Sequence, residues 1–306
     1  MRTYPLSRRK WMGVAAAAAA SAYAPSGRAA DPPRPKVAAV FTEMRLRSHA
    51  FHILTSLMGP YLFRGKWIDP GVDVVSFYAD QFPNGDMTRD ASERFKVPLY
   101  KTIDEALCLG GKTLAVDAVA LIGEHGRYPR NELGQTMYPR KEFFDQIVAV
   151  IDRSKRPVPV FNDKHLSYRW DWAKAMYDDA QRLKIPFMAG SSVPLAERRP
   201  PIEFPAGAVV EEAVSIHGGG IESYDFHALE VMQSLIEARR GGETGIKQVQ
   251  LLDGDACQKA AAEGRWSSEL VAAAMNAERQ AGMKRRPTLR FPDEPFVPRH
   301  VVLVTY

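Results

Sequence analysis

The sequence predicts an α/β protein in which a Rossmann-like, doubly wound parallel sheet is followed by a smaller α/β domain. Short, nearly all-apolar segments alternate with amphipathic helical patterns between residues 36 and 192. This alternation is typical of parallel strands covered on both faces by crossover helices. A proline-rich stretch, PLAERRPPIEFPAGA, then interrupts the pattern and indicates a domain boundary. We therefore expect a Rossmann-like domain at residues 36–192 and a substrate or dimerisation domain at residues 193–306.

The first domain is expected to contain several strands with helices between them. The strand segments are KVAAVF (36–41), GVDVVSFYAD (71–80), DAVALIGEHG (117–126), VPVFND (158–163) and IPFMAGSS (185–192). Helical periodicity covers residues 48–62, 88–95, 140–154 and 170–184. In KTIDEAL, Thr102 followed three residues later by Glu105 predicts a capping box.

The second domain shows a looser pattern. AVVEEAVSIHGGG (208–220) predicts a strand that runs into a glycine loop, and helices are expected at residues 223–240, where GGETG ends the helix, and at 267–281. Strands are expected at residues 246–254 and 300–306. The chain stops on this last apolar strand, which is the ending expected of a truncated version of a longer domain. We find no internal repeat.

The first 29 residues have the layout of an export signal. Arg8 and Arg9 precede a weakly hydrophobic run at residues 12–24, and the small residues Gly27 and Ala29 suit cleavage after Ala29. SRRKWM resembles the twin-arginine motif, so we expect export to the periplasm, with residues 30–35 as a proline-rich spacer. The apolar run is too short to cross a bilayer, and we expect no membrane span in the mature chain. The alternative is an alanine-rich disordered tail.

The basic charge of the chain belongs to this segment. The formal net charge is +5, but residues 1–29 hold five of the 41 bases and no acid, which leaves 36 bases against 36 acids. We therefore expect a small-molecule partner and no nucleic acid. Cys108 and Cys257 could pair in an oxidising compartment, but two isolated cysteines do not make a zinc site.

Polar residues stand at the ends of the predicted strands. Four ends carry Thr42–Glu43, Asp80, Glu124–His125 and the run from Asn162 to His165. The carboxyl ends of parallel strands meet at one edge of a sheet, where ligands bind. These side chains predict a small-molecule site, although polar strand ends also cap helices.

Three segments resemble one family. FYADQFPNGDMTRDASERFKVPLYKTIDEAL is similar to a second strand with a terminal acid, followed by a helix and a "gvp-y-t-d-e-e-L" segment. DKHLSYRWDWAKAMYDDAQRLKIPFMAG resembles an E-K-P-L segment with the next helix and strand, and GGGIESYDFHALE resembles a G-G-G, D-x-x-x-H-x-x-D helix start. Across residues 36–250 the chain thus resembles the Gfo/Idh/MocA oxidoreductases, which join a Rossmann domain to a C-terminal α/β substrate domain.

The resemblance implies an NAD- or NADP-dependent oxidoreductase acting on a sugar or polyol, with homo-oligomers as a family-level expectation. Lys164 falls on the family's active-site lysine and His227 on its catalytic histidine, which accepts the hydroxyl proton as hydride passes to the nicotinamide. Asp80 falls on the acid that binds the adenosine ribose. Further cofactor contacts are expected from Thr42, Arg45, Glu124 and His125, and substrate contacts from Asp163, His165 and Glu230.

The sequence departs from the family after its first strand. Where the family has G-x-G-x-x-G, this chain reads TEMRLRSHA, in which Arg45 and Arg47 could bind phosphate by charge. His165 replaces the proline of E-K-P, and Ser223 stands in place of an acid.

Two alternatives therefore stay open, namely a redox-inactive lyase or isomerase and a carbohydrate-binding module. Metal assistance would draw on Glu43, Glu124, His125, Asp163, His165 and His227. No spacing such as H-x-x-x-H supports it, so no metal ligand is assigned.

Overall fold

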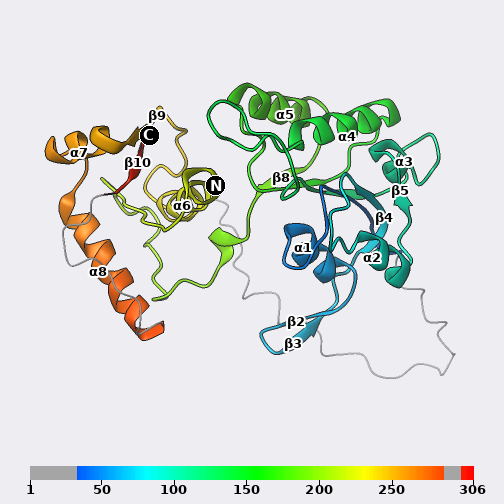
Figure 1. Cartoon of the computed structure of the whole chain (residues 1–306), viewed down its shortest axis with the longest axis horizontal. Helices are drawn as coiled ribbons and strands as arrows, with labels where there is room; N and C mark the ends of the chain where they lie inside the picture. The colour runs from blue at the N-terminus through cyan, green and yellow to red at the C-terminus, as the bar shows by residue number, and fades with distance from the viewer. Residues whose placement is uncertain (1–32, 286–297) are drawn as a thin grey trace, which may run out of the picture. The chain divides into compact units, whose positions relative to one another are not determined.

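The computed structural model describes residues 33–285 and 298–306 (Figure 1). The predicted signal segment and the first residues of the spacer lie outside this range. The chain divides into two units, Met1–Arg34 and Pro35–Tyr306, and the architecture below is that of the second. Within the described part, no helix is both long and apolar enough to cross a membrane.

Six parallel strands form the central sheet. They are β1 (Lys36–Phe41), β4 (Asp73–Ala79), β5 (Leu99–Tyr100), β6 (Ala118–Ile122), β7 (Val160–Asp163) and β8 (Phe187–Gly190). Their order is β5-β4-β1-β6-β7-β8, and every neighbouring pair is parallel. Counted within this sheet the order is 3-2-1-4-5-6, which is that of the Rossmann fold. The predicted fold class is confirmed, and the order reverses between β1 and β6.

The two faces of the sheet carry separate cores, as expected for a doubly wound fold. Alternation along β1 sends Ala38 and Val40 to one face and Ala39 and Phe41 to the other. Helices α3 (Ile103–Cys108), α4 (Arg140–Ser154) and α5 (Trp170–Arg182) cover the first face, and α1 (His49–Leu57) and α2 (Thr88–Phe95) cover the second (Figure 1).

Local signals explain where these helices begin and end. Thr102 Oγ1 accepts a hydrogen bond from Glu105 N, and the Glu105 carboxylate accepts one from Thr102 N, so the predicted capping box is confirmed. The helix expected to reach residue 62 ends at Leu57, because Gly59 and Pro60 follow it. A hairpin that the sequence did not predict, β2 (Tyr61–Phe63) with β3 (Lys66–Ile68), takes its place.

The C-terminal part holds a small antiparallel sheet. Strand β9 (Gln248–Asp253) pairs with β10 (His300–Thr305), beside helices α6 (Ile221–Ile236), α7 (Gly254–Ala262) and α8 (Ser268–Arg285), and a 3-10 turn lies at Val193–Leu195. The prediction of a strand within residues 208–220 is wrong, because none of these residues lies in a strand. Glu211 and Glu212 would place charge on both faces of such a strand. The boundary between residues 192 and 193 remains a prediction.

The two cysteines do not form a disulfide. Cys108 and Cys257 are both buried free thiols. Cys257 Sγ lies 3.0 Å from the Leu252 carbonyl oxygen, and Arg153 lies 3.2 Å from Cys108 Sγ. Burial raises the pKa of both thiols, which disfavours the nucleophilic thiolate form.

Candidate active site

The turn between β1 and α1 is filled by its own side chains. Thr42 and Glu43 are buried, and Thr42 Oγ1 donates a hydrogen bond to the Glu124 carbonyl oxygen at 2.5 Å. Glu43 Oε1 accepts a charge-assisted bond from Arg45 Nε at 2.5 Å. Ser48 Oγ caps α1 by accepting from Phe51 N. The helix N-terminus is therefore capped from within the chain, and a 3% exposed carboxylate lies before it.

Histidines and an acid continue this network across the strand ends. His49 Nδ1 lies 2.6 Å from Asp163 Oδ2, at the end of β7. The ring of His49 contacts that of His125 edge to face, with centroids 5.1 Å apart, and Arg45 Nη2 lies 3.4 Å from His125 Nδ1. Burial, followed by the charge of His49, lowers the pKa of His125. Arg45 and His125, which were predicted to contact the cofactor, thus lie close together at the strand ends. Their contacts there are with each other and with Glu43 and His49 of the same chain.

Asp80, the predicted ribose ligand, also accepts hydrogen bonds from side chains of this chain. Its Oδ1 accepts a hydrogen bond from Tyr78 Oη at 3.1 Å, and its Oδ2 accepts one from Tyr128 Oη at 2.6 Å. Burial and the Asp80 charge raise the pKa of Tyr78 to about 12 and also raise that of Tyr128, so both phenols stay protonated donors.

The turn between β1 and α1 does not offer a dinucleotide the binding surface that a glycine-rich loop provides. Pyrophosphate binds where free backbone N–H groups and a helix N-terminus approach it closely. Here the buried side chains of Thr42 and Glu43 fill the turn, and Glu43 pairs with Arg45, so the Arg45 charge is already engaged by a carboxylate. The residues present do not form a pyrophosphate cradle.

Lys164 stands on a strained turn directly after β7. Its φ of 68° lies in the left-handed region, which is uncommon for a residue with a side chain. Two contacts hold the turn: Lys164 N donates to the Gly190 carbonyl oxygen at 2.9 Å, and the buried Asn162 Nδ2 donates to the Lys164 carbonyl oxygen at 3.2 Å. Strain of this kind is typical of functional sites.

A buried ion pair lies beneath the lysine. Lys164 Nζ is 3.9 Å from Glu124 Oε2, while Glu124 Oε1 is paired with Arg140 Nη2. Arg140 is 1% exposed, and its Cζ lies over the Tyr138 ring, 5.0 Å from the centroid. Sequence reasoning missed Arg140, because an arginine at a helix start is usually exposed to solvent.

His165 is a neutral histidine that is bonded to Arg140. Its Nε2 lies 3.2 Å from Arg140 Nη1, and because a guanidinium can only donate, Nε2 accepts this bond. Burial first, then the charges of Arg140 and Lys164, lower the pKa of His165 to about 3. Its ring also contacts Phe226, with centroids 5.0 Å apart. His165 thus lies between the Lys164 turn and α6.

His227 forms a histidine–carboxylate pair on α6. Its Nδ1 lies 3.2 Å from Glu230 Oε2 and 3.4 Å from Ser191 Oγ. Ser191, which follows β8, donates to Glu230 through both its hydroxyl, at 2.5 Å, and its backbone N–H, at 2.9 Å. Glu230, expected from the sequence as a substrate contact, therefore orients the imidazole. Ser191 was missed, although the same strand-end reasoning applied to IPFMAGSS would have found it.

Comparisons with known proteins give partial matches to solved structures only. No family model and no curated protein sequence matches the chain. It is similar to a solved Gfo/Idh/MocA family oxidoreductase from Vibrio cholerae, with 18% identity and a TM-score of 0.34 over 52% of this chain and 39% of that one. GenD2 from gentamicin A biosynthesis, solved with NAD, gives 17% identity and a TM-score of 0.41 over 72% and 58% of the two chains. Biliverdin reductase from Synechocystis, solved with biliverdin and NADP+, has 13% sequence identity and a TM-score of 0.39, and the match covers 72% of this chain and 63% of that one.

The chain spans less than two thirds of the length of each of these proteins. The structural neighbours of this chain include Gfo/Idh/MocA oxidoreductases and proteins solved with NAD or NADP.

Proposed function

We propose that this chain is an acid–base enzyme that moves protons on a small, hydroxyl-rich carbonyl compound of the sugar or polyol class. The observation that carries the proposal is the oriented His227–Glu230 pair, which is held by Ser191, the residue after Gly190, whose carbonyl oxygen accepts the Lys164 backbone N–H. The Lys164 ammonium lies 3.9 Å from Glu124, which is paired with the buried Arg140. This is the lyase or isomerase alternative left open by the sequence. It requires no bound dinucleotide.

His227 supplies the general base. The contacts from Glu230 and Ser191 both engage Nδ1, so Nε2 is the nitrogen left to face a substrate. A carboxylate on one imidazole nitrogen fixes the tautomer and stabilises the imidazolium that forms when the other takes a proton. General base catalysis of this kind contributes typically ~10²–10⁴-fold to the rate.

Lys164 supplies the positive charge for a developing oxyanion. Its Nζ is 3.9 Å from Glu124, which is beyond hydrogen-bond reach, and Glu124 is bound more closely by Arg140. The ammonium donors of Lys164 can therefore turn to a substrate oxygen. A fixed cation aimed at the position where negative charge appears stabilises the transition state.

The reaction balances without an oxidant. His227 Nε2 removes the proton from the carbon beside a carbonyl, the C–H electrons form a carbon–carbon double bond, and the carbonyl oxygen takes the negative charge next to Lys164. Where the deprotonated carbon bears a hydroxyl group, the hydroxyl proton passes to the former carbonyl oxygen and the imidazolium gives its proton to the former carbonyl carbon, so the carbonyl moves to the neighbouring carbon and the compound is isomerised. Alternatively the imidazolium protonates a departing hydroxyl group, which gives elimination of water.

A second candidate is nicotinamide-dependent oxidation on the same acid–base pair. It is favoured by the strand order, whose reversal between β1 and β6 is the place where Rossmann folds bind dinucleotides. The filled β1–α1 turn counts against it.

Nucleotide binding separates the two candidates. We expect no change in NADH or NADPH fluorescence and no thermal shift with either nucleotide at millimolar concentration. Saturable binding of one equivalent would favour the oxidoreductase instead.

Turnover separates both from a carbohydrate-binding module. On a panel of keto sugars and sugar acids, His227→Gln and Lys164→Met should lose at least ~10²-fold in kcat, while the exposed Lys174→Met retains it. Binding of a sugar by the wild-type chain with no turnover of any panel member would favour the binding module.

Export to the periplasm is a separate proposal that rests on residues 1–29 alone. Replacing Arg8 and Arg9 together by lysine should retain the full-length chain in the cytoplasm, as measured by cell fractionation. Periplasmic protein from this variant would contradict a twin-arginine route.

A further inference from the structure

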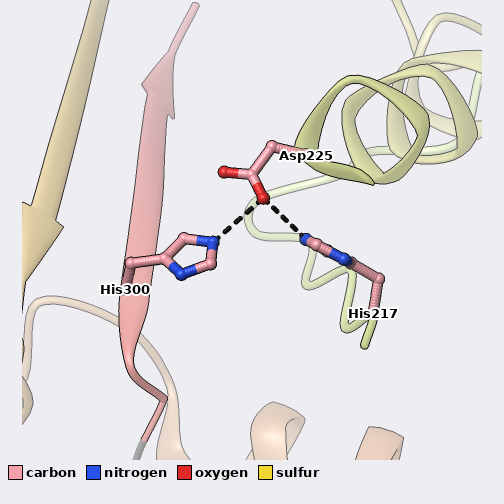
Figure 2. Close-up of side chains that lie close together, drawn as sticks. All are labelled: His217, Asp225 and His300. Carbon is pink, nitrogen blue, oxygen red and sulfur yellow. Dashed lines mark hydrogen bonds and ion pairs between the residues drawn. The ribbon is translucent and has the colours of Figure 1, made fainter. Parts of the chain in front are cut away.

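Three side chains of the types that bind metals converge in the C-terminal part, on a different set of contacts from those of His227 and Glu230. His217 lies in the loop before α6, Asp225 lies in α6, and His300 is the first residue of β10. Figure 2 shows both imidazoles directed at the Asp225 carboxylate. Each Nε2 lies 2.9 Å from the same oxygen, Asp225 Oδ1.

The cluster is largely shielded from water and incompletely paired. The exposed fractions of the three side chains are 24% for His217, 12% for Asp225 and 18% for His300. Asp225 Oδ1 is approached by two imidazoles, whereas the buried Oδ2 of the same carboxylate has no hydrogen-bond partner among the described residues. Buried polar atoms are nearly always paired, so an unpaired carboxylate oxygen indicates a missing partner.

We propose that His217, Asp225 and His300 bind one divalent transition-metal ion through the two Nε2 atoms and the Asp225 carboxylate. The three candidate ligand atoms all lie within 4.8 Å of one another. Metal–ligand bonds of ~2.0–2.1 Å place neighbouring ligands about 2.9 Å apart in an octahedral site and about 3.3 Å apart in a tetrahedral one. The two observed 2.9 Å separations, each between an Nε2 atom and Asp225 Oδ1, match the octahedral value and lie a few tenths of an ångström below the tetrahedral one.

The donor set selects the class of ion. Two imidazoles and one carboxylate suit Zn²⁺, Fe²⁺, Co²⁺ or Ni²⁺, whereas Ca²⁺ and Mg²⁺ prefer sites built from oxygen ligands. Three protein ligands also leave at least one position for water.

The metal would fix α6 from the side opposite to His227. Asp225 and His227 are two residues apart on one helix, so their side chains do not face each other. Asp225 contacts β10 through His300, while His227 contacts Ser191 after β8. The ion would join three segments that are up to 83 residues apart in sequence, and it would restrain the helix that carries the proposed base.

Metal content tests the site. The full chain, prepared without a polyhistidine tag, would be stripped with EDTA, desalted and incubated with Zn²⁺, Co²⁺, Mg²⁺ or Ca²⁺. We expect one equivalent of Zn²⁺ or Co²⁺ by mass spectrometry of the metal, and an increase in Tm with these two ions only. Failure to retain either ion would overturn the proposal.

Variants locate the ion. His217→Gln and Asp225→Asn should each lose at least tenfold in Zn²⁺ affinity and remove the Co²⁺ absorption bands, whereas His52→Gln, at an exposed histidine of α1, should keep both. Circular dichroism checks that each variant folds. If His217→Gln does not fold, Asp225→Asn still tests the site, because asparagine has nearly the same shape as aspartate. Metal binding that survives both variants, or that is lost in His125→Gln at the strand ends, would contradict the assignment. Failure here would leave the proposed function standing, because that function uses no metal.

Discussion

Removing the Arg140 guanidinium should destabilise the protein strongly. Arg140 is 1% exposed, pairs with Glu124 and lies 3.2 Å from His165 Nε2. Arg140→Met keeps much of the aliphatic stem but leaves the buried Glu124 carboxylate without its main partner. Breaking a buried pair in this way costs ~3–5 kcal/mol. Since Lys164 Nζ remains 3.9 Å from Glu124, we expect the lower end, about 3 kcal/mol, which is a large part of a typical stability of ~5–15 kcal/mol.

Urea unfolding followed by circular dichroism measures this change as a shift of the midpoint at constant m. The matched control is Arg182→Met, because Arg182 pairs with Asp179 on the exposed surface of α5 and should be replaced with little effect. The double variant Arg140→Met, Glu124→Gln should recover part of the loss, because no buried charge is then left unpaired. A loss below about 1 kcal/mol for Arg140→Met would refute the view that this buried pair supports the site.

Two further predictions concern pH and the capping box. Burial beside Arg140 and Lys164 lowers the pKa of His165 to about 3, whereas an unfolded histidine titrates near ~6.5. Between these values the unfolded chain binds more protons, so stability should fall as the pH drops below about 6.5, by up to ~1.4 kcal/mol per pH unit from this group. Urea midpoints at pH 7, 6 and 5 should show a smaller slope for His165→Gln than for wild type, and an equal slope would contradict the assignment. Thr102→Ala should lower the stability by about 1 kcal/mol in thermal unfolding, whereas Thr102→Ser should retain most of it; equal losses in the two variants would show that the hydroxyl is not the cap.

Local patterns predicted most of the parallel sheet, because each buried strand is a short apolar run between helical patterns. The hairpin at Tyr61–Phe63 and Lys66–Ile68 was missed, since a helical pattern at residues 48–62 continued across Gly59 and Pro60. The strand expected within residues 208–220 failed for a different reason. Strand pairing is a long-range property, and β9 pairs with β10 instead.

The sequence predicted those site residues that lie at the carboxyl ends of the parallel strands. Strand-end reasoning found Glu124, Lys164 and His165. In the structure Glu124 lies near Lys164 and pairs with Arg140, which also contacts His165. It could not show that Glu43 fills the turn after β1, because burial depends on the packing around it. The His217–Asp225–His300 cluster gave no sequence signal, since 75 residues separate Asp225 from His300.

Solvent exchange tests the central claim, proton transfer by His227, most directly. The chain would be incubated in D₂O with each keto sugar and sugar acid of the panel, and deuterium at the carbon beside the carbonyl would be followed by NMR. We predict deuterium incorporation into at least one compound without added nucleotide, and its loss in His227→Gln but not in His52→Gln. Absence of exchange across the panel, or equal exchange by wild type and His227→Gln, would contradict the account.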